Sequence, residues 1–131
     1  SVDFLVGSFE SIPPIVGDRM MLKQVIFNIL DNALKFSPDG GVVRIEASLA
    51  DEGLRAVTIT ITDVGIGLDD KDFDRVFEPL EQIEHPRSGR YTGAGIGMAL
   101  ARRYVELHHG TLRVYSEGAG KGTTFAVTLP L

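Results

Sequence analysis

The chain has 131 residues, of which 44% are hydrophobic, and a formal net charge of −5. This length and composition fit one domain over residues 1–131, whose core would bury roughly two thirds of the surface of the unfolded chain. The absence of cysteine excludes disulfides and thiolate metal sites, and no apolar run reaches the roughly 18 residues of a membrane span. The acidic balance without a basic run argues against nucleic acid as a partner. Because it starts at Ser1 without a leader, we expect a piece of a longer protein.

The first half of the chain predicts one helix and one hairpin after a weakly patterned start. A short edge strand is expected at residues 2–6. Apolar residues at helical spacing predict a helix over residues 18–36 with Asp18 as its N-cap; they are Leu22, Val25, Ile26, Ile29 and Ala33. Alternation of apolar and polar residues then predicts two half-buried strands at residues 43–49 and 57–63.

The second half predicts one further helix and two strands after a long excursion. Residues 68–92 lose clean periodicity, and such a long excursion in a compact domain is usually functional or mobile. A helix is expected over residues 96–109, with Gly110 as its stop and Ile96, Leu100, Tyr104 and Leu107 along its apolar face. Strands are expected at residues 112–117 and 123–129.

Amide and charged side chains form a stripe on the first predicted helix, opposite its apolar face. Its members are Gln24, Asn28, Asp31, Asn32 and Lys35. A solvated helix face would explain such a stripe, but asparagine is a mediocre helix former, and two of them one turn apart suggest a role for their carbonyl oxygens. Oxygen ligands suit Mg²⁺ bound to substrate phosphates, and Lys35 has the charge to meet a phosphate.

Asp63 ends the second strand of the predicted hairpin on the core side, because odd positions of that strand are apolar. A buried carboxylate needs a hydrogen-bond donor. Two interpretations are open: Asp63 caps the following turn through backbone N–H groups, or it accepts a hydrogen bond from an amino group of a ligand, such as that of adenine. Gly65 and Gly67 would let a flat ring lie against the backbone.

A second glycine cluster, Gly93, Gly95 and Gly97, opens the second helix. Free N–H groups and the positive dipole end of a helix start bind anions, although a flexible turn is the alternative. The sequence contains neither the Gly-x-x-x-x-Gly-Lys-Ser/Thr loop nor Gly-x-Gly-x-x-Gly, so a phosphate site here would be of another type.

Together these segments resemble the ATP-binding catalytic domain of bacterial sensor histidine kinases, in the superfamily that includes gyrase and the large heat-shock chaperones. The resemblance covers about residues 15–131. Five segments in order carry it: an asparagine box at residues 24–36, a first glycine box at 63–67, a phenylalanine box at 73–80, a second glycine box at 93–100 and a closing glycine segment at 120–125.

The resemblance implies an α/β two-layer sandwich of the Bergerat type, with helices over one face of a mixed, mostly antiparallel sheet and a mobile lid at about residues 68–95. It also implies that Asn28 and Asn32 bind Mg²⁺ and that Asn28 and Lys35 are catalytic. The ATP-binding residues that it implies are Asn28, Asn32, Lys35, Phe36, Asp63, Gly65, Gly67, Arg90, Gly93, Gly95, Ile96, Gly97, Met98 and Thr123. It further implies that Arg87 and Arg90 of the lid contact the γ-phosphate or the partner domain; for both, a solvated loop arginine is the alternative.

This chain departs from the superfamily pattern at several positions. Gln24 stands where the ATP-hydrolysing members carry a glutamate base, and a neutral amide cannot take a proton from water, which disfavours a dedicated ATPase. Leu80, Ala94, Ile96 and Met98 replace commoner residues of the boxes, which affects the expected packing of the lid more than nucleotide binding.

The function implied is transfer of the γ-phosphate of ATP to a histidine on a separate helical dimerisation domain of the same cytoplasmic or membrane-anchored parent, which then serves a response regulator. His85, His108 and His109 are expected to be surface or capping residues, because none lies in the family's acceptor context. Two alternatives are open: a serine/threonine kinase of the superfamily that acts on an anti-anti-sigma-type partner, and a non-enzymatic, nucleotide-regulated docking module. No direct contact with a membrane is expected.

Overall fold

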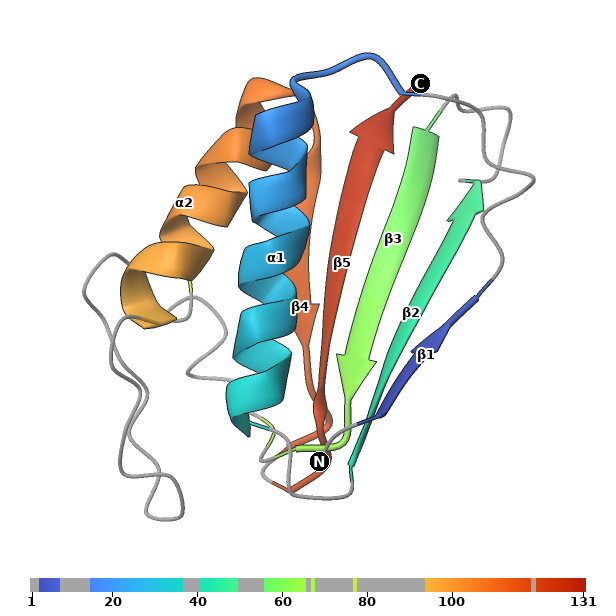
Figure 1. Ribbon diagram of the computed structural model, residues 1–131, viewed down its shortest axis with the longest axis vertical. Helices are drawn as coiled ribbons and strands as arrows, with labels where there is room; N and C mark the ends of the chain where they lie inside the picture. The colour runs from blue at the N-terminus through green and yellow to red at the C-terminus, as the bar shows by residue number, and fades with distance from the viewer. Residues whose placement is uncertain are drawn as a thin grey trace.

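The computed structural model describes residues 3–7, 15–36, 41–49, 56–65, 67, 77, 94–118 and 120–131. In these ranges a five-stranded sheet carries two helices on one face, which confirms the predicted two-layer α/β sandwich (Figure 1). The elements are β1 (Asp3–Val6), α1 (Arg19–Phe36), β2 (Val42–Leu49), β3 (Ala56–Asp63), α2 (Ala94–Leu107), β4 (Thr111–Tyr115) and β5 (Thr123–Pro130). Neither helix has the length and apolar character that crossing a bilayer requires.

The sheet is mixed, with strand order β1-β2-β3-β5-β4. Only β1 and β2 run parallel among the described strand pairs; β2–β3, β3–β5 and β5–β4 are antiparallel. Alternation divides the two faces as predicted, since Val57 and Ile61 of β3 are buried under the helices. On the opposite face, the hydroxyls of Thr58 and Thr128 form a cross-strand hydrogen bond of 3.1 Å.

Helix α1 begins as the sequence predicts. The Asp18 carboxylate accepts a hydrogen bond of 3.0 Å from the backbone N–H of Met21, so Asp18 is confirmed as the N-cap. The backbone N–H of Asp18 itself donates to Nε2 of His108, at 2.9 Å. His108 thereby links the end of α2 to the start of α1, a capping role consistent with the expectation for the histidines.

The predicted apolar face of α2 is wrong at Leu100 and Leu107, although Tyr104 packs against the core as predicted. The side chain of Ile96 lies outside the described residues. Leu100 and Leu107 are 38% and 48% exposed, while the side chains that enter the core are Met98, Ala101 and Val105. Both stripes have helical spacing, so periodicity does not separate them. The small side chain of Ala101 faces inward because α2 packs closely against both α1 and β4.

The end of α2 also differs in detail from the prediction. The residue in the left-handed conformation is His109, with φ of 64°, rather than Gly110. Gly110 is required for another reason: a Cβ atom there would clash with the carbonyl oxygen of Thr128. The glycine therefore allows the chain leaving α2 to run against β5.

Replacement of Ile29 by alanine tests the core between α1 and the sheet. Ile29 has 0% exposure, so Ile29→Ala should lower the free energy of unfolding by about 2–5 kcal/mol through lost burial and a cavity. Phe27→Ala is the matched control on the same helix, because Phe27 is 67% exposed and its truncation should change stability by no more than about 0.5 kcal/mol. Urea denaturation of both variants measures the difference, and equal effects would contradict this packing.

Candidate functional site

Three of the predicted segments come together toward one end of the molecule. The C-terminal half of α1, the end of β3 and the first turn of α2 lie toward the same end (Figure 1). A hydrogen bond of 2.9 Å from Nδ2 of Asn28 to the carbonyl oxygen of Gly97 joins α1 to α2 there. The fold therefore gathers residues that are far apart in the sequence.

Asp63 is buried at the end of β3, with 3% exposure, as its place in the strand predicts. Its Oδ1 accepts hydrogen bonds from the backbone N–H of Gly65 at 2.8 Å and from that of Thr123 at 3.2 Å. Capping of the following turn is thus present. The second oxygen, Oδ2, receives no hydrogen bond from the described residues, so it is available to accept one from a ligand.

Burial raises the pKa of the Asp63 carboxyl above its ordinary value of 3.8, and the backbone hydrogen bonds from Gly65 and Thr123 oppose that rise. A buried carboxylate with an unpaired oxygen is less favourable in the free protein than one that meets a donor. A ligand that offers an N–H group to Oδ2 would therefore be favoured.

The first glycine box, after Asp63, packs on the closing glycine segment before β5. Gly67 has φ of 71°, and a Cβ atom there would clash with the carbonyl oxygen of Gly118. Gly122 has φ of 79°, and its Cβ would clash with the carbonyl oxygen of Asp63. Backbone contact thus requires glycine at both positions. The hydroxyl of Ser116 adds a hydrogen bond of 2.6 Å to the carbonyl oxygen of Gly122, a contact that the sequence pattern did not indicate.

The amide stripe of α1 does not lie wholly opposite the core, which corrects the predicted position. Gln24 and Asp31 are exposed and Asn28 is half-buried, but Asn32 is only 5% exposed. The stripe follows the edge of the apolar face, because Asn32 lies one turn after the core residue Ile29. The Asn32 amide forms no hydrogen bond with another described residue, and a buried amide without a partner is unusual unless a ligand or water meets it.

Gln24 was predicted as a member of the amide stripe and as a neutral replacement for a base, and the structure gives it a specific contact. Its Nε2 donates a hydrogen bond of 2.7 Å to Oδ1 of Asn28. An acceptor oxygen has two lone pairs, so this hydrogen bond occupies one of the two on Asn28. The four-residue spacing on a helix is the signal from which this pair follows.

The remaining predicted site residues are described to different degrees. Met98 packs in the core, while the backbone N–H of Thr123 binds Asp63. Lys35 and Phe36 belong to the last turn of α1, and Gly95 and Ile96 to the first turn of α2. The side chains of Lys35, Phe36 and Ile96 lie outside the described part of the chain. Arg87, Arg90, Gly93 and most of the predicted lid also lie outside them.

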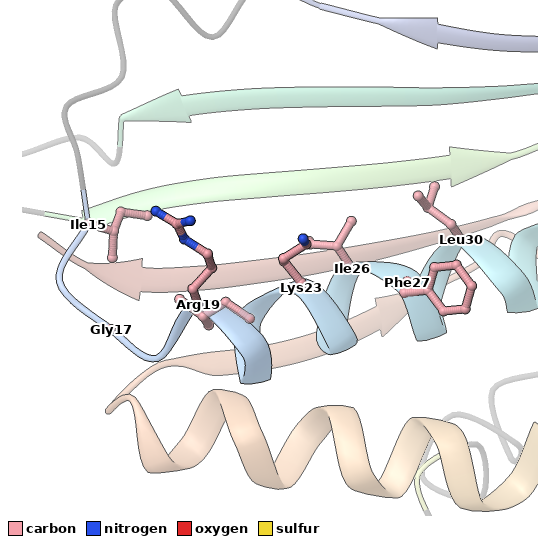
Figure 2. Close-up of a pocket in the computed structure, with 8 residues that line it drawn as sticks. Ile15, Gly17, Arg19, Lys23, Ile26, Phe27 and Leu30 are labelled. Carbon is pink, nitrogen blue, oxygen red and sulfur yellow. The ribbon is translucent and has the colours of Figure 1, made fainter.

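A groove of about 620 Å³ lies along another part of α1 and contains none of the predicted site residues. Figure 2 shows Arg19 and Lys23 projecting from neighbouring turns on the side that also carries Ile26. The residues that line the groove are Ile15, Gly17, Arg19, Leu22, Lys23, Ile26, Phe27 and Leu30. The groove is separate from the end of the molecule that holds Asp63, and the sequence pattern did not indicate it.

Comparison with known proteins agrees with this geometry. A model of the family described as "Histidine kinase-, DNA gyrase B-, and HSP90-like ATPase" matches residues 17–131. The non-motile and phage-resistance protein of Caulobacter vibrioides is 36% identical over 124 residues, which is 94% of this chain and 15% of that protein. The autoinducer 2 sensor kinase/phosphatase LuxQ of Vibrio parahaemolyticus is 38% identical over 119 residues, which is 87% of this chain and 13% of that protein.

Two solved structures share the fold over 98% of this chain. The mycobacterial sensor histidine kinase MprB superposes with a TM-score of 0.82 at 31% identity, over 83% of its own chain. Full-length ShkA in complex with AMPPNP superposes with a TM-score of 0.76 at 29% identity, over 25% of its chain. The chain spans only 13–15% of the two curated relatives and 25% of full-length ShkA.

Replacement of Asp63 by asparagine tests the effect of burial on its pKa. Because the pKa of Asp63 is higher in the folded protein than its ordinary value of 3.8, the charged carboxylate destabilises the fold at pH values above the folded-state pKa. This destabilisation disappears as the pH falls from the folded-state pKa to 3.8. The amide oxygen that the substitution introduces still accepts both backbone hydrogen bonds. We therefore expect Asp63→Asn to be at least as stable as the natural chain at pH 7, with its relative advantage shrinking as the pH falls. Denaturation from pH 7 to pH 4 measures this, and an advantage that grows toward low pH would contradict it.

Proposed function

This chain belongs to the histidine kinase-, DNA gyrase B- and HSP90-like ATPase family, as the ATP-binding catalytic domain of a sensor histidine kinase, and on that premise we propose that it binds Mg²⁺-ATP and donates the γ-phosphate to a histidine of a separate helical domain. The proposed acceptor domain belongs to the same parent protein, and a response regulator receives the phosphate afterwards. The chain covers 13–15% of the curated relatives just described, so the activity of the whole parent is part of this proposal.

The hydrogen bonding of the buried Asp63 carboxylate is the observation that carries the proposal. Its Oδ1 is held by two backbone N–H groups, and its buried Oδ2 is left without a donor from the described residues. The exocyclic amine of adenine is a donor of the right kind, while a guanine would present a carbonyl oxygen at the corresponding position. A buried carboxylate that can only accept therefore favours ATP over GTP.

The residues of α1 fit a magnesium ion bound to phosphates. Asn28 keeps a free lone pair on Oδ1, and the buried amide of Asn32 has no described partner. Mg²⁺ takes oxygen ligands and, when bound, neutralises charge on the phosphates. We propose that Asn28 and Asn32 hold it, that Lys35 adds a positive charge beside the phosphates, and that Gly93, Gly95 and Gly97 line them.

The same residues favour transfer over hydrolysis. Gln24 is neutral and cannot activate water as a base. In the proposed reaction a nitrogen of the acceptor imidazole attacks the γ-phosphorus, the bond to the bridging oxygen breaks, and ADP leaves with that oxygen. Positioning and charge neutralisation contribute most of the rate enhancement in such transfers.

Titration calorimetry with ATP, with and without Mg²⁺, tests nucleotide binding. The natural chain should bind ATP saturably, and Asp63→Asn should weaken binding by about 10-fold or more, because an amide N–H would then oppose the adenine amine. Glu46→Gln is the matched acid-to-amide control, since Glu46 lies on β2 away from the predicted site, and it should bind within about twofold of the natural chain. An absence of saturable heat from the natural chain would contradict the proposal and favour the docking module.

Mixing the chain with the histidine-bearing remainder of its parent tests phosphotransfer. We expect ATP-dependent phosphate on the remainder that is labile in acid and stable in base, and little ATP hydrolysis by the chain alone. Asn32→Ala should lower the initial rate by at least about 10-fold, through loss of a metal ligand. Acid-stable phosphate on serine or threonine would instead favour the alternative kinase class, and no phosphate at all would overturn the proposed activity.

A further inference from the structure

Two side-chain amides and one backbone carbonyl form a continuous hydrogen-bonded chain across the site. Nε2 of Gln24 donates to Oδ1 of Asn28 at 2.7 Å, and Nδ2 of Asn28 donates to the carbonyl oxygen of Gly97 at 2.9 Å. The first contact lies within α1 and the second crosses from α1 to α2. Both ends of the Asn28 amide are thus engaged.

The donor and acceptor groups in this series of hydrogen bonds fix which way each amide is oriented. The Gly97 carbonyl can only accept, so the atom of Asn28 that faces it must be the NH₂ nitrogen. The Asn28 oxygen must then face Gln24, which has to present its own NH₂ group. Without the donor on Gln24, only the contact with Gly97 would hold the Asn28 side chain, and the amide could tilt about that single hydrogen bond.

We infer that Gln24 is a positioning residue for magnesium: together with the Gly97 carbonyl, it holds the Asn28 amide in the one orientation that presents its oxygen to the metal ion. This inference rests on the proposed function, because it assumes that Asn28 binds the metal. Gln24 would then orient a metal ligand, in addition to being the neutral residue that stands where ATP-hydrolysing members carry a glutamate base. The hydrogen bond uses one lone pair of Oδ1 and leaves the other for the ion.

The steric situation at Gly97 supports an electrostatic role for this chain of contacts. A Cβ atom on Gly97 would lie 3.7 Å from Cγ of Asn28, which is an ordinary contact. Gly97 therefore leaves room beside the Asn28 amide. Its orientation depends on the two hydrogen bonds, so the loss of one should change metal binding while the fold persists.

The variant Gln24→Met tests the inference, because methionine keeps the length and helix propensity of glutamine but cannot donate. ATP affinity is measured by calorimetry in Mg²⁺ and in EDTA, and the ratio of the two affinities is compared. Gln24→Met should reduce the enhancement of ATP affinity by Mg²⁺ by about three- to tenfold, which corresponds to about 0.7–1.4 kcal/mol. The ATP affinity in EDTA should stay within about twofold of that of the natural chain. The melting temperature of the free protein should change little.

Two further variants separate positioning from a general effect on the helix. Lys23→Met, on the neighbouring exposed position, should leave the ratio of affinities unchanged. In an Asn28→Ala background, Gln24→Met should have no further effect on the ratio, because Gln24 acts through Asn28. An unchanged ratio in Gln24→Met, or an undiminished effect in the Asn28→Ala background, would overturn the inference.

The same measurements distinguish this inference from the proposed function. If the natural chain binds no ATP in either buffer, both fail. If it binds ATP equally well with and without Mg²⁺, nucleotide binding stands but Asn28 is not a metal ligand, and the inference is wrong. If Mg²⁺ tightens binding equally in the natural chain and in Gln24→Met, only the role of Gln24 is refuted.

Discussion

The buried carboxylate of Asp63 is the constraint on which this end of the molecule depends. Two backbone N–H groups, from Gly65 after β3 and from Thr123 at the start of β5, converge on its Oδ1. They can reach it only because the adjoining backbone turns tightly, which requires glycine at positions 67 and 122. The energetic penalty of burying this charge is therefore offset by local backbone geometry, and the second oxygen remains for a ligand.

Much of this arrangement follows from local patterns in the sequence. Period-two alternation predicts that Asp63 faces the core, and the structure confirms it. Helical spacing and a capping carboxylate predict the start of α1 at Asp18, which is also confirmed. These features depend on residues close together in the chain, so no tertiary information is needed to find them.

The features that the sequence did not predict depend on distant contacts. The inward face of α2 is set by how closely the helix approaches α1, which favours Ala101 over the larger Leu100. Gly67 and Gly110 are glycines because the carbonyl oxygens of Gly118 and Thr128 approach them from remote segments. Spacing alone cannot reveal a contact partner that lies tens of residues away.

The two polar systems at this end of the fold are complementary in chemistry. Around Asp63 the available group is a buried anionic acceptor, whereas on α1 the available groups are the second lone pair of the Asn28 oxygen and the Asn32 amide, which has no hydrogen bond to another described residue. An acceptor that is desolvated selects a donor such as an amine, while clustered oxygens select a hard cation. A molecule that carries an amine at one end and metal-bound phosphates at the other satisfies both systems at once. Because it would contact β3 and α1, and α1 is tied to α2 through Asn28 and Gly97, its binding would stabilise the two layers together.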